Sequence, residues 1–313
     1  MSKWTITHAM PISNQKAVAP HYGKAISLRP LIQRVTAPNP SPFTYKGTNT
    51  YIIGQKTLAV IDPGPDNDSH LTTLLKAING RPVSHIFVTH CHRDHSPLAK
   101  RLAAKSGALI VAEGPYRQSL PHLDLQKGLS ESVEADFQPD IALPDNSIIG
   151  NDEWRIRCIT TPGHMANHAS FSLEGHGVIF TGDHVMGWAT TVVAPPDGCM
   201  HDYLTSLDKL AVHIQSDQCY FPAHGGYVDN PQKLIRTIKA RLKSREEAIL
   251  YQLQHGNHTI AAITTALYRH IDPRLYKGAK LLVFSHLIDL TERKVVVCEG
   301  TLALSATYRF VGY

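Results

Sequence analysis

The stretch Thr89-His90-Cys91-His92-Arg93-Asp94-His95 gathers three imidazoles and a carboxylate in one short segment. It follows the apolar, β-branched run from Val83 to Val88, which predicts a buried strand that ends where the histidines begin. Neutral imidazole and carboxylate are common metal ligands, and a turn at a strand end can aim them at two neighbouring points. A chance surface turn is a poor alternative, even in a chain with 19 histidines among 313 residues, because further candidates follow downstream. We therefore expect a metal site here.

Three more candidate ligands each follow a strand-like segment and a small turn residue. They are His164 after Pro162-Gly163, Asp183 after Gly182, and His224 after Pro222-Ala223. The complete predicted set has five imidazoles and two carboxylates, which suits two metal ions: His90, His92, Asp94, His95, His164, Asp183 and His224.

Two metal ions that share a carboxylate lie about 3.5–4 Å apart, and a water that bridges them is deprotonated near neutral pH to become a nucleophile. We expect Asp183 to be the shared carboxylate, and we expect Asp94 and Asp183 to be catalytic residues. Nitrogen and oxygen ligands without thiolate suit zinc, with two ions per chain, although manganese and iron tolerate the same ligands.

The order of expected elements indicates a mixed α/β (α+β) fold with two sheets. Antiparallel strands come first, βα units follow, with Ser96 as the cap of the second helix, and residues 115–140 are expected to form loop and short helix over the active face. The expected strands are 25–28, 31–35, 49–53, 58–61, 83–88, 108–111, 148–149, 154–160, 169–173, 178–180 and 218–221, and the expected helices are 69–78, one from residue 96, and 202–213.

A change of pattern after residue 228 predicts a second domain. A long basic helix over 231–254 precedes helical stretches over 259–268 and 278–290 and strand-like runs over 295–297 and 302–310. Helix, helix, helix and hairpin is the order of a winged-helix domain. We therefore divide the chain into residues 1–228, a hydrolase domain, and 229–313, a winged-helix-like domain.

Composition fits a folded protein in a reducing compartment. A hydrophobic content of 42% and a charged content of 18% exclude general disorder, and a net charge of +5 permits an anionic substrate without demanding one. The five cysteines include no CxxC pair, and no apolar segment resembles a signal peptide or a membrane span. We expect a cytoplasmic protein with no membrane partner, and we leave a homodimer open.

The pattern His90-x-His92-x-Asp94-His95, followed by His164, Asp183 and His224, resembles the metallo-β-lactamase superfamily over residues 25–228. The resemblance implies an αββα sandwich with two metals at one edge between the sheets. It implies that His90, His92 and His164 bind one metal, that Asp94, His95 and His224 bind the other, and that Asp183 bridges them. The most familiar β-lactamases carry a cysteine near the place of Asp183, so a drug-hydrolysing role is not implied.

Further motifs resemble the β-lactamase-like protein 2 group within this superfamily. They are Gly47-Thr48-Asn49-Thr50-Tyr51, Thr161-Pro162-Gly163-His164 with His168, Gly182-Asp183, Asp202-Tyr203 with Ser206-Leu207, and the winged-helix-like tail. A member of that group is an endoribonuclease on single-stranded RNA, while many bacterial members have no assigned substrate. His168 is also similar to a histidine of glyoxalase-II-like hydrolases. His168 and Tyr203 are candidate substrate-binding residues, with support of the site and packing as the respective alternatives.

The leading hypothesis is a dinuclear zinc-dependent hydrolase that uses a metal-bridging hydroxide on an ester, thioester or phosphodiester. The alternatives are an endoribonuclease on single-stranded RNA and a glyoxalase-II-like thioester hydrolase, so the substrate is a small molecule or RNA. A nucleic-acid-binding module with a structural metal site is the non-enzyme alternative, and it is disfavoured because structural zinc sites are closed and usually use thiolate. A basic stripe on the 231–254 helix could track phosphates, but Glu246 and Glu247 interrupt it, which favours a solvated face: Lys233, Arg236, Lys239, Arg241, Lys243 and Arg245.

Overall fold

The computed structural model describes residues 19–123, 132–213 and 219–312. Residues 1–18 of the first predicted domain, and residues 124–131 of the loop predicted over 115–140, lie outside this part of the chain. Within the described residues, no helix combines the length and hydrophobicity that crossing a membrane requires.

The first sheet holds seven strands in sequence order, and its strands β1 to β6 match the predicted ones. Strands β1 to β4 pair antiparallel, and β4 to β7 pair parallel. The strands are β1 (Ala25–Arg29), β2 (Ile32–Thr36), β3 (Asn49–Ile53), β4 (Leu58–Ile61), β5 (Val83–Phe87), β6 (Leu109–Ala112) and β7 (Ile141–Ala142).

Two helices cover the outer face of this sheet, namely α1 (Asp68–Ile78) and α2 (Leu98–Ser106). The side chain of Asn67 caps α1 by accepting from the backbone N–H of His70, and the apolar face of α1 is buried. The prediction that Ser96 caps α2 is wrong. The N-cap is Pro97, and the Ser96 hydroxyl donates to Glu134 instead.

The second sheet has the strand order β12-β11-β10-β9-β8. Its strands pair antiparallel except for the β11–β12 pair, which is parallel. They are β8 (Ile148–Gly150), β9 (Arg155–Thr160), β10 (Ala169–Leu173), β11 (Val178–Gly182) and β12 (Cys219–Pro222). The helices α3 (Met200–His213) and α4 (Pro231–Gln254) pack on its outer face through a shared apolar cluster.

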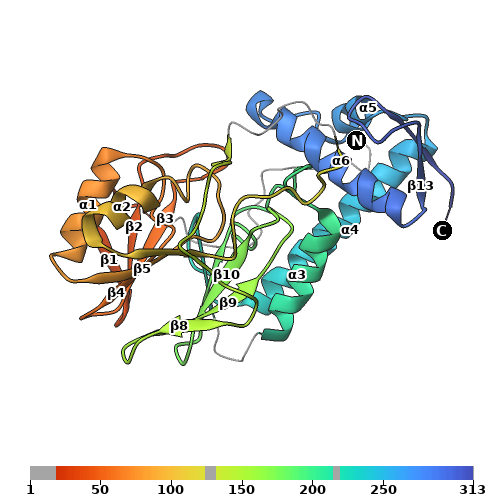
Figure 1. Ribbon diagram of the computed structural model, residues 1–313. Coiled ribbons are helices and arrows are strands. Elements are labelled where there is room, and N and C mark those ends of the chain that lie inside the picture. Colours follow the sequence, from red (N-terminus) through yellow and green to blue (C-terminus); the bar gives the residue numbers. More distant parts are fainter. Residues whose placement is uncertain (1–18, 124–131, 214–218, 313) are drawn as a thin grey trace.

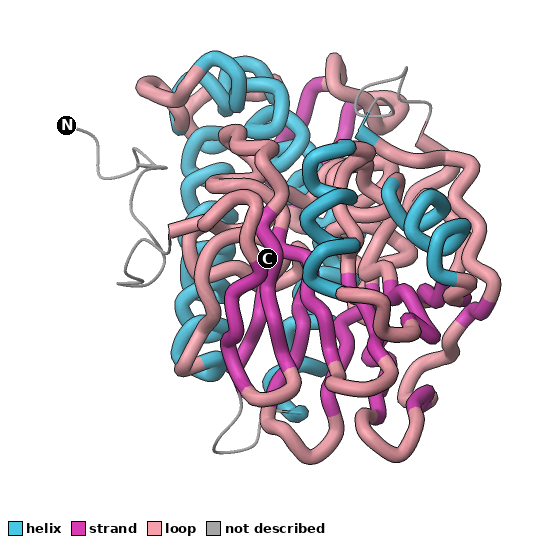
Figure 2. Tube along the Cα trace, turned by 90° about the vertical axis from the view of Figure 1, so that its left-hand side faces the viewer, coloured by secondary structure: helices cyan, strands magenta, loops and turns pink. Residues whose placement is uncertain are grey.

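Aromatic side chains fill the space between the two sheets. Tyr51 and Phe87 of the first sheet share one buried cluster with Phe171 and Phe180 of the second. The rings of Phe87 and Phe171 meet edge to face at 5.1 Å between centroids. With helices outside both sheets, the layers run α, β, β, α, as predicted (Figure 1), and Figure 2 views them from the side of α1 and α2.

The C-terminal region has a core of its own. It contains α5 (Ile260–Leu267), a 3-10 turn (Pro273–Leu275), α6 (Tyr276–Glu292), β13 (Val296–Glu299) and β14 (Thr307–Phe310). The strand predicted over 302–310 is therefore shorter than expected. Helix α4 joins both cores, because Ile238 packs with α3 whereas Ile249 packs with α5 and α6. A domain boundary at residue 228 stays a prediction.

Candidate metal centre

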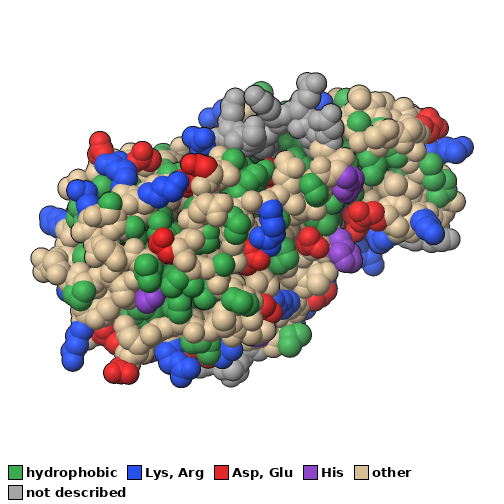
Figure 3. All heavy atoms as spheres, viewed as in Figure 1, with side chains coloured by type: hydrophobic (Ala, Val, Ile, Leu, Met, Phe, Trp, Pro, Cys, Tyr) green, Lys and Arg blue, Asp and Glu red, His purple; other side chains and the backbone are tan. Residues whose placement is uncertain are grey.

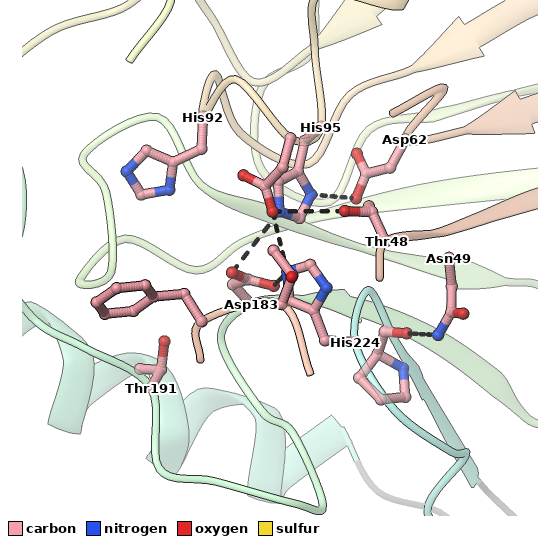
Figure 4. Close-up of polar contacts among 12 residues, drawn as sticks. Thr48, Asn49, Asp62, His92, His95, Asp183, Thr191 and His224 are labelled. Atoms are coloured by element: carbon pink, nitrogen blue, oxygen red, sulfur yellow. Dashed lines mark hydrogen bonds and ion pairs between the residues drawn. The ribbon is translucent and has the colours of Figure 1, made fainter. Parts of the chain in front are cut away.

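All seven predicted ligands meet at one edge of the sandwich, where four strands end. The turn after β5 carries four of them, and the other three follow β9, β11 and β12. Figure 4 shows His95, Asp183 and His224 lying close together, with His92 to their left.

Two glycines allow tight turns directly before the candidate ligands His164 and Asp183. Gly163 has a φ of +136°, and a Cβ there would lie 2.3 Å from the Cα of Tyr203. Gly182 has a φ of +50°, and a Cβ there would lie 2.6 Å from Nε2 of His168. A side chain at either position would collide with these neighbours, and the turn could relieve the collision only by moving, together with the candidate ligand that follows the glycine.

The first group of ligand atoms consists of three imidazole nitrogens. Nδ1 of His92 lies 2.9 Å from Nε2 of His90 and 3.0 Å from Nε2 of His164. Nδ1 of His164 donates to the carbonyl of Val192 at 2.6 Å, which leaves Nε2 with its lone pair. Burial lowers the pKa of all three rings, to about 3 for His92. Neutral imidazoles therefore face one point, as the ligands of a single cation do.

The second group combines Asp94, His95 and His224. Oδ2 of Asp94 lies 3.1 Å from Nε2 of His224 and 3.3 Å from Nε2 of His95. Asp183 lies between the groups, because its Oδ1 is 3.2 Å from Nε2 of His224 while its Oδ2 is 3.8 Å from Nε2 of His164. Its position is that of a carboxylate shared by two sites.

The electrostatics of the second group favour ionised carboxylates. Burial alone would raise the pKa of Asp183, but the neighbouring His224 and His95 outweigh burial and hold that pKa well below its usual value. Burial alone would lower the pKa of His224, yet Asp183 and Asp94 raise it to about 9. Two buried carboxylates thus offer full negative charge to a cation.

Several of the ligand atoms contact one another without forming hydrogen bonds, which is an arrangement that fits cations between them. Among the described residues, Nε2 of His95, Nε2 of His224 and Oδ1 of Asp183 are buried and form no hydrogen bond, which is rare for buried polar atoms. The ligand atoms fall into three overlapping groups, each with its atoms within 4.8 Å of one another. A pair of divalent cations would satisfy all of these atoms.

Asp62, the residue directly after β4, orients the site, although its sequence context did not mark it as a site residue. Its Oδ2 lies 3.0 Å from Nδ1 of His95, and its two oxygens accept from the backbone N–H and the hydroxyl of Thr89, each at 2.8 Å (Figure 4). A carboxylate behind a ligating histidine fixes which nitrogen faces the metal. The signal that could have revealed it is the parallel pairing of Ile61 with Phe87, which sets Asp62 beside the turn.

The Gly47-Thr48-Asn49 segment supports the same edge. The side-chain N–H of Asn49 donates to the carbonyls of Pro222 and Gly225, at 3.2 and 2.9 Å, and so fixes the turn that carries His224. The hydroxyl of Thr48, which is labelled in Figure 4, donates to the carboxylate of Asp94 at 3.5 Å.

The two predicted substrate-binding residues lie behind the site. His168 is fully buried, and its Nε2 accepts from the backbone N–H of Asp183 at 3.3 Å. This contact agrees with the alternative role of supporting the site. Tyr203 is also fully buried, and its hydroxyl donates to the carbonyl of His184 at 3.0 Å. The prediction that Tyr203 contacts substrate is wrong, because its side chain packs in the core and does not reach the cavity.

A cavity of about 300 Å³ opens onto the ligands. Phe43, Val192 and Ala194 give it apolar walls, and Arg274, Lys277 and Gly278 bring the C-terminal region to its rim. These rim residues were not predicted from the sequence, because nothing in their local pattern distinguishes them from other surface residues. The complete lining of the cavity is Phe43, Thr44, His92, Asp94, Ser132, His164, Asp183, Thr191, Val192, Ala194, Asp197, His224, Arg274, Lys277 and Gly278.

Comparison with known proteins identifies the family. The model of the metallo-β-lactamase superfamily matches residues 44–250. The chain belongs to the metallo-β-lactamase superfamily. The predicted class, a metal-dependent hydrolase of this superfamily, is thereby confirmed.

Relatives within the superfamily have varied names. The chain is 29% identical over 271 residues to the β-lactamase-like protein 2 homolog of Caenorhabditis elegans, which covers 84% of this chain and 81% of that protein. It is 26% identical over 263 residues to the atrochrysone carboxyl ACP thioesterase AgnL7 of Paecilomyces divaricatus, which covers 82% of this chain and 76% of that protein.

Solved structures share the fold along nearly the whole chain. A β-lactamase domain protein from Burkholderia ambifaria has a TM-score of 0.78 at 21% identity, covering 94% of this chain and 95% of its own. A metallo-β-lactamase family protein from Thermus thermophilus has a TM-score of 0.73 at 23% identity, covering 91% of this chain and 100% of its own. These two structures therefore share the fold of the C-terminal region as well as that of the sandwich.

Proposed function

We propose that this chain is a dinuclear zinc-dependent hydrolase whose substrates are thioesters. The observation that carries the proposal is the position of Asp183 between two groups of ligand atoms, at the floor of a cavity with apolar walls. When bound, two divalent cations would lower the pKa of a shared water and so supply a nucleophile near neutral pH. Zinc suits the nitrogen and oxygen donors, and manganese or iron would be tolerated.

Two groups of residues would hold the two cations. His90, His92 and His164 would bind one of them, and the second group of ligands would bind the other, with Asp183 between them. Behind these ligands, Asp62 accepts from Nδ1 of His95 and leaves Nε2 to face Asp94 and Asp183.

A thioester is favoured by two observations. Relatives at 26–29% identity include proteins named ACP thioesterases, and the apolar walls Phe43, Val192 and Ala194 suit an acyl chain beside the reacting bond. Hydrolysis adds water across the C–S bond, because the acyl carbon gains OH while the sulfur leaves as thiol and gains the proton.

RNA cleavage is the second candidate function. The surface of α4 does not favour it. Arg245 of the predicted basic stripe is buried, and the ammonium of Lys239 is paired with Asp208. On the face drawn in Figure 3, basic and acidic side chains are interspersed. We propose that residues 229–313 are a winged-helix-like domain that closes the cavity instead of tracking a phosphate backbone.

A substrate panel tests the proposal. The zinc-loaded protein is assayed with an acyl thioester, a lactone, a phosphodiester and an unstructured RNA, with the Asp183→Ala variant as the background control. We expect turnover of the thioester by the wild type alone. Cleavage of RNA without thioester hydrolysis would replace the proposal with the ribonuclease.

A further inference from the structure

The cavity over the metal centre has a rim of positive charge that comes from the C-terminal region. Arg274 and Lys277 line the same cavity as Asp94, His164 and His224. More than 180 residues separate Lys277 from Asp94 in the sequence, so only the packing of the C-terminal region on the sandwich brings them to one cavity.

Only one of these charges remains uncompensated among the residues that the structure describes. The guanidinium of Arg274 pairs with the carboxylate of Asp272, with Nη2 2.6 Å from Oδ2. Asp197, the carboxylate in the lining that is not a candidate ligand, accepts from the hydroxyl of Tyr116 at 2.7 Å. Lys277 is exposed, and within the described part of the chain its ammonium has no hydrogen bond or ion pair.

The backbone that carries Lys277 is held in place from both sides. The adjacent Gly278 is buried against Phe43, since a Cβ there would lie 3.6 Å from Cε1 of that ring. The hydroxyl of Tyr276 lies 3.0 Å from that of Thr265, which ties the start of α6 to α5. A flexible side chain therefore extends from a fixed point at the rim.

We propose that Lys277 is a specificity-determining residue that binds a phosphate on the thiol half of the substrate. The substrates are then thioesters of 4′-phosphopantetheine, either free, in coenzyme A, or attached to a carrier protein. The inference rests on the proposed thioester hydrolysis. Apolar walls take the acyl group, the ligands surround the thioester, and the uncompensated ammonium at the rim meets the phosphate of the 4′-phosphopantetheine arm.

Two substrates that differ only by the phosphate provide the test. Hydrolysis of an S-acyl-4′-phosphopantetheine is compared with that of the same S-acyl-pantetheine, by wild type and by Lys277→Ala, Lys277→Arg and Lys280→Ala. Lys280 follows on the same helix but does not line the cavity, so its replacement is the matched control. Metal content and melting temperature are measured for every variant. Acyl-coenzyme A and an acylated carrier protein are added to tell the free carrier from the protein-bound one.

We expect the wild type to prefer the phosphorylated substrate roughly 10-fold or more in kcat/KM, mainly through KM, as one charge-assisted contact provides. Lys277→Ala should lose this preference, because its kcat/KM falls far more for the phosphorylated thioester than for the pantetheine thioester, and Lys277→Arg should keep most of the preference. Calorimetric binding of S-methyl-4′-phosphopantetheine should weaken in Lys277→Ala and not in Lys280→Ala. Equal turnover of both thioesters by the wild type overturns the inference and leaves the proposed function intact. Turnover of neither thioester by the metal-loaded wild type overturns the proposed function itself.

Discussion

At the scale of single residues, Asp183 connects the two halves of the candidate centre. One oxygen lies toward His224 and the other toward His164 and His95, so the carboxylate is close to histidines of both groups. Its backbone N–H donates to Nε2 of His168, which fixes the backbone that carries the carboxylate.

The Asp183→Ala variant should therefore lower turnover by roughly 10²-fold or more, because it removes the group that sets the spacing of the cations and the acidity of the water between them. The fold should be unchanged, since the side chain lies at the edge of the sandwich. Kinetics and circular dichroism check both points. A folded variant with nearly wild-type rates would show that Asp183 does not bridge.

Asp62 gives a second prediction at this scale. Asp62→Asn removes the charge behind His95 and should weaken metal affinity by about 10- to 100-fold, as the loss of such outer partners does. Competition with a zinc chelator measures it. Asp66→Asn is the control, since Asp66 is an exposed carboxylate paired with Arg101. Equal affinities in the two variants would remove Asp62 from the centre.

The sequence marked the candidate ligands but not their supports. Four candidates are clustered after one strand, and the other three each follow a strand and a small residue, so a local pattern marks all of them. Asp62 and Lys277 depend on which strand lies beside which and on how α6 packs over the cavity, and no local pattern records either. The prediction that Tyr203 contacts substrate failed for the same reason. A position in a motif does not show which side of a helix faces the core.

At the scale of elements, the turns after the strands are as constrained as the strands. Gly163→Ala should lower the free energy of unfolding by roughly 3 kcal/mol, because it combines a disfavoured φ with a collision against α3. Gly175→Ala is the control, since its φ is +78° but a Cβ there meets nothing within 4 Å. Urea unfolding measures both. Similar losses in the two variants would mean that the collision contributes nothing.

Strands and helices were predictable where apolar periodicity and turn residues agreed. The predicted strands before residue 229 all occur, because each is a short apolar run bounded by Gly, Pro or Asp. The cap of α2 was not predictable, because the Ser96 hydroxyl donates a hydrogen bond to Glu134, a residue far away in the sequence. Strand β14 is short because the residues before it turn instead of pairing.

At the scale of the whole molecule, α4 makes the two parts interdependent. Its first half covers α3 and the second sheet with four buried side chains: Leu234, Ile235, Ile238 and Leu242. Its second half belongs to the C-terminal core. A fragment of residues 1–228 would lack α4 and would lose the contact made by its first half. The burial of each of these four side chains contributes roughly 1.5–3 kcal/mol to the free energy of unfolding.

We therefore expect the fragment 1–228 to be strongly destabilised, since this loss approaches the whole stability of an ordinary domain. The fragment 1–244, which keeps the first half of α4, should melt at a higher temperature and retain metal. Differential scanning calorimetry of both fragments decides the matter. A 1–228 fragment that melts like the longer one would place the boundary before α4.

The number of metal ions per chain tests the central claim most directly. Protein expressed with supplemented zinc, freed of loosely bound ions by gel filtration, is analysed for metal by mass spectrometry and for protein by amino-acid analysis. The arrangement of two ligand groups around Asp183 predicts close to two equivalents per chain. A chelator should remove both together with all activity, and added zinc should restore both. A single equivalent that persists in excess zinc would contradict the two-metal centre.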